Sequence, residues 1–470
     1  MQLPNIKDAR KRTKEEVQHI YLDQHYDKDM FKNKKYFLRT YGCQMNVHDG
    51  EEIAARLESL GFTPTDTIED SDVVILNTCA IRENAHDKLY GFLGRCKHEK
   101  EKNNKDLIIG ICGCMAQEEG VVNDLIKNHP YVDIVFGTHN IHELQNLLIN
   151  KHSKQNIEVY SCEGNVYENI PYKRESNIKA WVNIQYGCDK FCTYCIVPYT
   201  RGKQRSRKSE DIIEEVRELY NNGYQEVTLL GQNVNAYGKD FDYPYDFADL
   251  LAEVSQTGIA RIRFVTSHPW DFTDKMIDVI STCSNIMPYI HLPIQSGSDR
   301  ILKLMGRKYT IKEYLEIVRK LREKVPGVSI STDIIVGFPG ETEEDFQMTL
   351  DIVNKVKYDL AYTFIFSPRE GTPAAKMKDD TSEDEKKERL AKLNELINKY
   401  ALEANEKMKN KVCDVLILGE SDKNNKYMGY TENMKLVNVE CPKDLVGKII
   451  PVKITDVKTW SLDGVIYDKH

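Results

Sequence analysis

The stretch Cys188–Asp189–Lys190–Phe191–Cys192–Thr193–Tyr194–Cys195 places three thiols within eight residues, in the spacing C-x3-C-x2-C. Thiolates bind soft metals, and a closed structural zinc site needs four ligands, but no other cysteine or histidine follows closely. Three thiolates on one tight loop suit three irons of a cubane cluster, whose fourth iron stays open for another ligand. A zinc knuckle that lacks a ligand and a set of disulfides are both disfavoured, because the spacing is specific and an intracellular chain keeps its thiols reduced.

The composition is that of a globular protein. The 470 residues suffice for roughly two to four domains. No apolar run reaches about 18 residues, and Met1–Lys35 is polar, so we expect a cytoplasmic protein with no membrane partner. Twelve cysteines in such a protein indicate metal or redox chemistry. The net charge of −8 argues against nucleic-acid binding over the whole surface, but it leaves room for a local basic patch.

The N-terminal part predicts an α/β domain. We expect residues 1–33 to form a charged, partly disordered extension, and residues 34–150 to form a parallel sheet with helices on both faces. The strands predicted there are Tyr36–Tyr41, Val73–Leu76, Leu107–Ile111 and Ile134–Phe136.

A cysteine follows each of the first three predicted strands: Cys43, Cys79 and Cys114. The carboxyl ends of parallel strands meet at one edge of a sheet, so these distant thiols can converge there. Free cysteine is also often a small core residue, and spacing alone leaves both interpretations open. Cys112 lies close enough to Cys114 for the sequence to confuse the two.

A second alternation of strands and helices follows residues 151–178, which are polar and predict a linker. Its six predicted strands are Trp181–Tyr186, Glu226–Leu230, Arg261–Val265, Tyr289–Leu292, Ser329–Ile335 and Leu360–Phe366. Six βα units, where a closed barrel has eight, predict a partial barrel that is open to a macromolecular substrate. The cysteine loop follows the first strand, on the carboxyl face where βα-barrel active sites lie.

The spacing of apolar residues along the sequence changes in the last part of the chain. Ser382–Asn410 predicts an amphipathic helix that packs on the barrel, so the barrel with this bridging helix spans residues 179–403. Residues 404–468 alternate with period two and predict a small antiparallel β-barrel.

Four segments together resemble the methylthiotransferase family of radical S-adenosylmethionine (SAM) enzymes. They are Tyr41–Asn46 (YGCQMN), Asn77–Ala85 (NTCAIRENA), Cys195–Arg207 (CIVPYTRGKQRSR) and Gly231–Tyr237 (GQNVNAY). They are most similar to the bacterial branch that acts on isopentenyl-bearing tRNA. The resemblance covers roughly residues 34–468. It implies an N-terminal flavodoxin-like domain, a central partial (β/α)6 radical SAM barrel and a C-terminal TRAM β-barrel.

The resemblance also implies two 4Fe–4S clusters and SAM as cofactors. One cluster would bind the radical set, defined here as Cys188, Cys192 and Cys195, and would cleave SAM reductively to a radical. The second would bind the auxiliary set, Cys43, Cys79 and Cys114, and would hold or donate sulfur, which a second SAM would methylate. The family pattern has no cysteine at the position that Cys112 occupies in this sequence. Electrons would come from a donor such as flavodoxin or ferredoxin.

The implied reaction converts N6-isopentenyladenosine at position 37 of tRNA to its 2-methylthio derivative. Adenine carbon 2 is a poor electrophile, so this replacement needs a radical. The alternatives are a threonylcarbamoyladenosine or ribosomal-protein substrate, or a non-enzymatic iron–sulfur protein. Gln44 and Met45 are neutral where the threonylcarbamoyl branch tends to carry a lysine, which favours the isopentenyl substrate. We expect a monomer that binds the anticodon stem-loop.

Polar residues at the ends of the barrel strands are candidates to bind SAM, since carboxamides and backbone groups can hold its amino and carboxylate ends. They are Gly231, Gln232, Asn233, Ser267, His268, Gln295, Ser296 and Asp333. Loop capping or solvation explains each of them equally well.

A basic run follows the cysteine loop: Arg201, Lys203, Arg205, Arg207 and Lys208. Most charge runs are solvated surface. The position of this one beside the cluster loop favours contact with RNA phosphates. We therefore predict that the basic run and the C-terminal barrel bind the tRNA.

Overall fold

The computed structural model describes residues 2–11, 16–23, 26–80, 83–150, 155–423 and 425–467. The chain forms two compact units. The first comprises residues 1–175, 185–191 and 195–207, and the second comprises residues 176–184, 192–194 and 208–470. No helix within the described ranges is long and apolar enough to cross a membrane.

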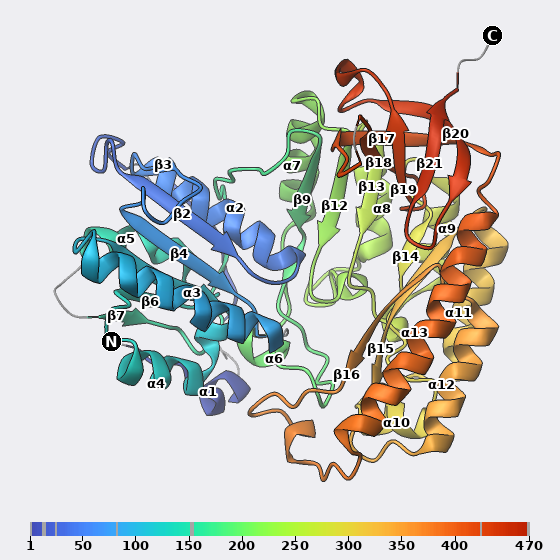
Figure 1. Ribbon diagram of the computed structural model, residues 1–470, viewed down its shortest axis with the longest axis horizontal. Coiled ribbons are helices and arrows are strands. Elements are labelled where there is room, and N and C mark those ends of the chain that lie inside the picture. The colour runs from blue at the N-terminus through green and yellow to red at the C-terminus, as the bar shows by residue number, and fades with distance from the viewer. Residues whose placement is uncertain are drawn as a thin grey trace. The chain divides into compact units, whose positions relative to one another are not determined.

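A six-stranded parallel sheet forms the centre of the first unit (Figure 1). Its spatial order is β3 (Thr63–Pro64), β2 (Lys35–Thr40), β4 (Val73–Thr78), β5 (Ile108–Gly113), β6 (Ile134–Phe136) and β7 (Asn156–Glu158). The first five strands have the flavodoxin-like order, with the topological switch point between β2 and β4. The predicted flavodoxin-like domain is therefore confirmed, and its four predicted strands are displaced by at most two residues.

Helices cover both faces of this sheet. On one face, α2 (Gln44–Ser59) and α5 (Leu144–Ile149) form a core with Ile75. On the other face, α3 (Glu83–Lys102) and α4 (Glu119–Asn128) form a core with Val74. Val74 and Ile75 are neighbours on β4, and the period of two along a strand sends them to opposite faces.

Two segments that were predicted to lack regular structure contain strands. The predicted extension forms α1 (Ile6–Lys11) and β1 (His19–Tyr21), and β1 pairs in parallel with β8 (Val166–Glu168) of the predicted linker. The same linker contributes β7 to the edge of the sheet. These predictions were wrong because strands of three residues show no apolar period and pair with distant partners. Residues 1, 12–15, 24, 25 and 151–154 of the two segments lie outside the described residues.

The chain on both sides of the cysteine loop belongs largely to the first unit. β10 (Gln185–Tyr186) pairs antiparallel with β11 (Arg205–Ser206). Between them, α6 (Val197–Thr200) contacts α1 and the 3-10 turn η1 (Cys114–Gln117). Tyr199 and Cys114 share a small core cluster there. The segment after the cysteine loop thus packs near the end of β5.

The second unit begins with a partial βα-barrel, as predicted. Two three-stranded parallel sheets, with the orders β13–β12–β9 and β14–β15–β16, are joined by an isolated bridge between Ile262 and Ile286. The strands are β9 (Lys179–Asn183), β12 (Glu226–Leu230), β13 (Arg261–Phe264), β14 (Tyr289–His291), β15 (Ser329–Val336) and β16 (Leu360–Ile365). One large hydrophobic core joins them to their helices, which are α7 (Ser209–Asn221), α8 (Phe247–Ser255), α9 (Asp274–Thr282), α10 (Asp299–Leu304), α11 (Ile311–Lys324) and α12 (Glu343–Val356).

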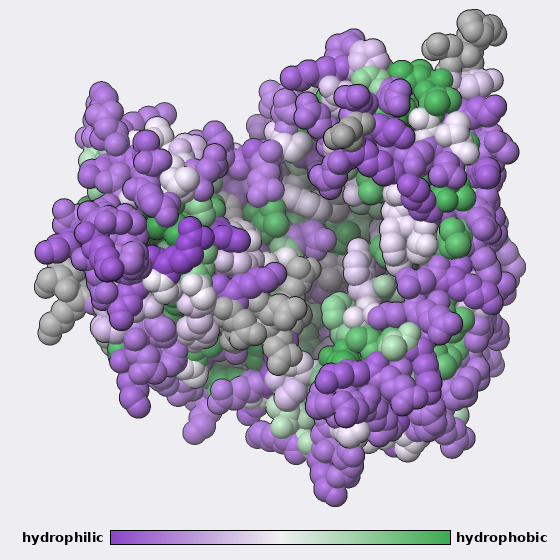
Figure 2. Space-filling model, viewed as in Figure 1, coloured by the Kyte–Doolittle hydropathy of each residue, from purple (hydrophilic) through white to green (hydrophobic). Residues whose placement is uncertain are grey.

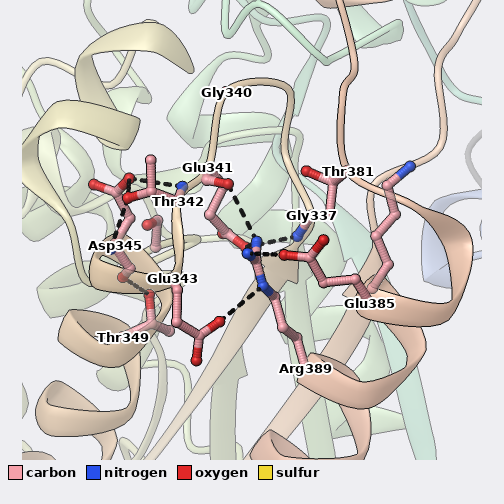
Figure 3. A network of polar contacts seen from close by, with 12 residues as sticks. Gly337, Gly340, Glu341, Thr342, Glu343, Asp345, Thr349, Thr381, Glu385 and Arg389 are labelled. Carbon is pink, nitrogen blue, oxygen red and sulfur yellow. Dashed lines mark hydrogen bonds and ion pairs between the residues drawn. The ribbon is translucent and has the colours of Figure 1, made fainter.

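The predicted bridging helix, α13 (Glu383–Glu406), packs on β16 and is fixed by a buried arginine (Figure 3). Arg389 Nη1 lies 2.8 Å from Glu341 Oε1, and Arg389 Nη2 lies 2.5 Å from Glu385 Oε1. Both Arg389 and Glu341 are almost fully buried. Thr342 caps α12, so the β15–α12 loop and α13 are held together at one point.

The end of the chain forms a closed antiparallel barrel, apart from one parallel pair between β19 and β21. Its strands are β17 (Val412–Glu420), β18 (Tyr427–Thr431), β19 (Leu436–Glu440), β20 (Ile449–Val457) and β21 (Leu462–Ile466). Alternate residues such as Ile450, Val452 and Ile454 fill its core, as the period of two predicts. The domain boundaries at residues 33, 150, 178 and 403 stay predictions.

Two arginines attach this C-terminal barrel to the βα-barrel. Arg261 donates to the carbonyl oxygens of Tyr430 and Asp414, both at 2.8 Å, and Arg263 donates to that of Thr431 at 3.0 Å. Arg261 begins β13, so the C-terminal barrel lies at the amino ends of the barrel strands. Figure 2 shows hydrophobic residues on its visible surface. Its exposed large apolar side chains are Val412, Trp460, Val465 and Tyr467.

Candidate metal centres

The auxiliary set lies at the carboxyl edge of the first sheet. Cys43 is the N-cap of α2 just after β2, Cys79 follows β4 directly, and Cys114 opens η1 after β5. These are adjacent parallel strands, and the switch point lies between the first two of them. Ligands bind at this point in open α/β sheets. The structure therefore brings together the strand ends that carry the predicted thiols.

Two glycines permit this close approach. Gly42 has φ 138°, and a Cβ atom built there would lie 2.7 Å from the Cβ of Cys79. Gly113 has φ 90°, and its Cβ would lie 2.3 Å from the carbonyl oxygen of Thr78. L-residues rarely adopt these φ values, and neither site has room for a side chain. Glycine at both positions lets the turns before Cys43 and Cys114 contact the end of β4.

The thiols differ in acidity. A hydrogen bond with Cys79, the charge of Arg201 and backbone groups at the start of α2 together lower the pKa of Cys43 to about 6, against the effect of burial. Burial raises the pKa of Cys114, while Arg201 opposes that rise. A thiol with a lowered pKa is readily the thiolate that binds metal. The donor chemistry of the auxiliary set therefore fits an iron–sulfur cluster.

No three His, Cys, Asp or Glu side chains within the described ranges are already arranged around a common metal position. Cys112 lies on β5 itself, fully buried in the apolar core with α2 and α5. The burial of Cys112 in that core favours Cys114, which lies past the strand end, as the ligand.

Arg201 lies beside the auxiliary set, although the sequence predicted it to face RNA. Its side chain is 5% exposed, and its Nη2 lies 2.5 Å from Oδ2 of Asp49 on α2. A second bond of 3.3 Å joins Nη1 to Oδ1 of the same carboxylate. The positive charge of Arg201 favours the thiolate form of both Cys43 and Cys114. Sequence reasoning missed this contact because Asp49 is 152 positions away.

Arg205 and Arg207 are buried as well. Arg205 donates to the carbonyl oxygen of Gly164 at 2.9 Å, and Arg207 Nη2 lies 2.7 Å from Oε2 of Glu168. The prediction that Arg201, Arg205 and Arg207 contact RNA phosphates is therefore wrong, because carboxylates and carbonyls inside the first unit hold their guanidinium groups. Of the five basic residues, Lys203 is partly exposed and Lys208 is exposed.

The radical set lies on the loop between β10 and α6. In the first unit, Cys188 donates its backbone N–H to the carbonyl of Gly202 at 3.0 Å, and its sulfur accepts from the backbone N–H of Lys190 at 3.4 Å. Cys195 is partly exposed just before α6. These contacts fix the loop backbone around Cys188.

Cys192 belongs to the second unit, where a buried arginine contacts it. Nη1 of Arg307 lies 3.6 Å from the sulfur of Cys192. The same guanidinium donates to the hydroxyl of Tyr309 at 3.0 Å and to the carbonyl of Pro293 at 2.9 Å. Sequence reasoning missed Arg307, which no spacing motif connects to a cysteine 115 positions away. A guanidinium in this position can stabilise a thiolate ligand.

The candidate SAM residues lie near the carboxyl ends of the barrel strands. Gly231, Gln232 and Asn233 follow β12, Ser267 and His268 follow β13, Gln295 and Ser296 follow β14, and Asp333 lies within β15. Of these, the Ser267 hydroxyl is buried and has no hydrogen-bond partner in the described part of the chain. Thr266 and Gln295 have φ values of 67° and 70°, a strain that often marks functional loops. The unsatisfied hydroxyl fits a polar ligand at this edge.

At least four of these candidates already have protein partners: Ser296 accepts from the backbone N–H of Ser298 and His268 from that of Trp270, both at 3.2 Å. Asn233 donates to Oδ2 of Asp271 at 2.6 Å. Nε2 of His291 lies 3.4 Å from Oδ2 of Asp333, and Nδ1 of His291 lies 2.9 Å from the hydroxyl of Ser331. Sequence reasoning missed His291, which the period of two on β14 places beside these polar residues.

Known proteins match this chain over its whole length. The Radical SAM superfamily matches residues 182–353, the TRAM domain matches residues 406–467, and the Uncharacterized protein family UPF0004 matches residues 35–137. The tRNA-2-methylthio-N(6)-dimethylallyladenosine synthase of Bacillus cytotoxicus is 55% identical over 100% of this chain and 93% of that protein. The Bacillus subtilis protein of the same name is 55% identical over 98% of this chain and 92% of its own length. The chain belongs to this synthase family.

Solved structures share the fold of the synthase chain. TsrM from Kitasatospora setae, a radical S-adenosylmethionine methyltransferase with cobalamin and a [4Fe-4S] cluster bound, has a TM-score of 0.53 and 13% identity, over 73% of this chain and 77% of that chain. A second TsrM structure, with tryptophan and a SAM analog, has a TM-score of 0.54 over 73% and 75%. At this identity the likeness extends to the fold alone.

Proposed function

We propose that the protein is a tRNA methylthiotransferase that converts N6-isopentenyladenosine (N6-dimethylallyladenosine) at position 37 to its 2-methylthio derivative. The observation that carries this function is the 55% identity over 100% of the chain to synthases of that name. The two cysteine sets, a SAM-type barrel and a TRAM domain provide the parts that such a reaction needs.

The radical set holds one 4Fe–4S cluster and the auxiliary set holds the other. When bound, the clusters and SAM supply the radical and sulfur chemistry that replaces the C–H bond at adenine carbon 2. The chain's own groups bind and orient these partners. Ser267 offers its unsatisfied hydroxyl to the zwitterionic end of SAM, with Gly231, Gln232, Gln295 and Asp333 nearby on the same edge.

The tRNA binds through the TRAM domain and the open side of the barrel. The TRAM barrel is attached at the amino ends of the barrel strands, and a five-residue strand such as β12 spans roughly 16 Å. It therefore grips RNA away from the reacting adenine, with exposed side chains such as Trp460 available for stacking on bases. Lys203 and Lys208 remain candidates for phosphate contacts. We also infer a cytoplasmic monomer that takes electrons from flavodoxin or ferredoxin.

The experiment that tests this function compares substrates. Purified, reconstituted protein receives SAM, dithionite and an anticodon stem-loop that carries isopentenyladenosine, threonylcarbamoyladenosine or unmodified adenosine. The apolar isopentenyl tail gains about 25 cal/mol for each Å2 buried, whereas a threonylcarbamoyl carboxylate needs a polar partner. We expect the 2-methylthio product, measured by mass spectrometry, from the isopentenyl stem-loop alone. Preferential product from the threonylcarbamoyl stem-loop would contradict the substrate assignment, and the Cys114→Ala variant is the negative control.

A further inference from the structure

The last strand of the βα-barrel, β16, carries aromatic residues at alternate positions. We call Tyr362, Phe364 and Phe366, which directly follows the strand, the aromatic row. Between them, Thr363 donates its hydroxyl proton to Oδ1 of Asn394 on α13 at 2.6 Å. Successive side chains of a strand point to opposite faces. The aromatic row therefore lies on the inner face of the barrel sheet, away from α13.

The aromatic row is buried at one end and half-exposed at the other. Phe366 is buried against Phe338, with ring centroids 5.2 Å apart, and Tyr194 of the cysteine loop packs on the same cluster. Tyr362 and Phe364 are 49% and 48% exposed. They lie on the last strand in the sheet order β14–β15–β16. The aromatic row thus leads from the loop of the radical set to exposed rings at the edge of the sheet.

An exposed aromatic side chain by itself indicates no ligand, because single apolar residues are common on protein surfaces. Tyr220 is such a residue, 48% exposed on the helix α7 that covers the barrel. Tyr362 and Phe364 differ from it because they are neighbours on one face of one strand, roughly 7 Å apart. They also continue into the cluster that holds Tyr194. Together they present a flat apolar surface beside the radical set.

The strands around the aromatic row suit a neutral ligand. Ile335 on β15 pairs with Phe364, and Asp333 pairs with Tyr362. The ring of His291 on β14 lies edge-on to that of Tyr362, with centroids 6.1 Å apart, and its Nε2 lies 3.4 Å from Oδ2 of Asp333. β14, β15 and β16 contain no lysine or arginine. A ligand carboxylate thus meets no cation from these strands, which makes its removal from water costly.

We propose that Tyr362 and Phe364 form the wall that binds the isopentenyl-bearing adenine of the tRNA and help to select it over a threonylcarbamoyl-bearing adenine. The inference rests on the proposed function, because it takes that adenine as the substrate. Bases stack on aromatic rings, and an apolar tail gains free energy when it is buried against them. In adenine, carbon 2 and the carbon that carries the N6 tail are separated by one ring nitrogen. The reacting carbon and the tail therefore need adjoining surfaces, and Phe366 joins the wall to the cysteine loop.

The test measures binding of anticodon stem-loops to the reconstituted full-length protein. The stem-loops carry isopentenyladenosine, threonylcarbamoyladenosine or unmodified adenosine. Tyr362→Ala and Phe364→Ala should each weaken binding of the isopentenyl stem-loop roughly five- to a hundredfold and reduce its preference over the unmodified one. Tyr220→Ala is the matched control: it removes an equally exposed ring from an outer helix and should keep all three affinities.

Phe364→Lys provides a second measurement that misfolding cannot imitate. It places a cation on the wall opposite Ile335, with no carboxylate directly across the strand pair. It should raise the affinity for the threonylcarbamoyl stem-loop relative to the isopentenyl one, whereas a misfolded protein would lose both. Tyr362→Leu and Phe364→Leu keep an apolar side chain without the ring. They take the place of the alanine variants, with the same expected direction, if those variants bind no iron.

The outcomes separate the two proposals. Loss of the isopentenyl preference in the alanine variants, with the parental affinities in Tyr220→Ala, supports the inference. If the parent prefers the isopentenyl stem-loop and these variants keep that preference, the wall is refuted and the proposed function stands. Variants that weaken SAM binding in equilibrium dialysis but keep the stem-loop affinities would assign the wall to SAM and also refute it. An unchanged ratio of affinities in Phe364→Lys would refute the role in selection. A parent that does not distinguish the stem-loops and makes no methylthio product would refute the proposed function, and the inference falls with it.

Discussion

A buried arginine lies beside each of the two cysteine sets, and the two arginines differ in whether a carboxylate neutralises their charge. Arg201, whose charge acts on Cys43 and Cys114, is paired with the carboxylate of Asp49. Arg307 contacts Cys192, and its other partners in the described residues are the hydroxyl of Tyr309 and a carbonyl oxygen, with no carboxylate among them. The first arginine therefore brings almost no net charge to its site, whereas the second brings a full positive charge.

This difference matters because a cluster changes its charge when it accepts an electron. An unbalanced cation favours the reduced state, and a cation with a carboxylate behind it favours that state less. The radical set is proposed to hold the cluster that passes an electron to SAM, whereas the auxiliary set is proposed to handle sulfur. The unpaired arginine thus lies beside the set proposed to transfer electrons, and the paired arginine lies beside the set proposed to handle sulfur.

The largest expected effect in this comparison belongs to Arg307→Gln. With the auxiliary set replaced by alanine, this variant should make the remaining cluster's potential more negative, by more than Arg201→Gln does at the other site. Loss of a charged hydrogen bond worth about 1.5–3 kcal/mol should slow SAM cleavage roughly ten- to a hundredfold. Product analysis of 5′-deoxyadenosine and a redox titration measure both effects.

The matched control for this variant is Arg300→Gln, which removes an arginine of α10 that is already paired with Asp345. It should leave the potential unchanged. An unchanged potential in Arg307→Gln, or an equal shift in the control, would show that the unbalanced charge of Arg307 has no special effect on the cluster.

The smallest expected effect concerns the exposed part of the basic run. Lys203→Gln and Lys208→Gln should each reduce the slope of log affinity for tRNA against log salt concentration, by about 0.7–0.9 for each phosphate contact that is lost. Filter binding at several salt concentrations measures this slope. The double variant Arg207→Gln, Glu168→Gln removes a buried pair without changing the net charge and should keep the slope. An unchanged slope in the lysine variants would show that Lys203 and Lys208 are solvated and make no phosphate contact.

Most of the fold could be predicted because apolar runs mark buried strands. Ile134–Phe136 and Glu226–Leu230 have the predicted bounds, and the period of two in the C-terminal barrel identified its core. The strands β1 and β8 escaped prediction because three residues carry no period and β1 pairs with a strand of the distant linker.

The cysteines of the candidate site could be predicted from their spacing and from strand ends, but the charges around them could not. Burial of Arg201 depends on Asp49, 152 positions away, and the contact of Arg307 with Cys192 spans 115 positions. A local basic run looks the same whether its charges are solvated or paired inside the protein. Only the tertiary structure distinguishes the two cases.

The most direct test of the two-site assignment compares SAM cleavage with methylthiolation in single cysteine variants. Replacing a member of the radical set by alanine should abolish SAM cleavage and remove about half of the iron, since we propose that each set holds one 4Fe–4S cluster. Cys114→Ala should retain SAM cleavage and lose the methylthio product, while Cys112→Ala, its buried neighbour, should keep both. A Cys112→Ala protein without product, beside a fully active Cys114→Ala protein, would contradict the assignment.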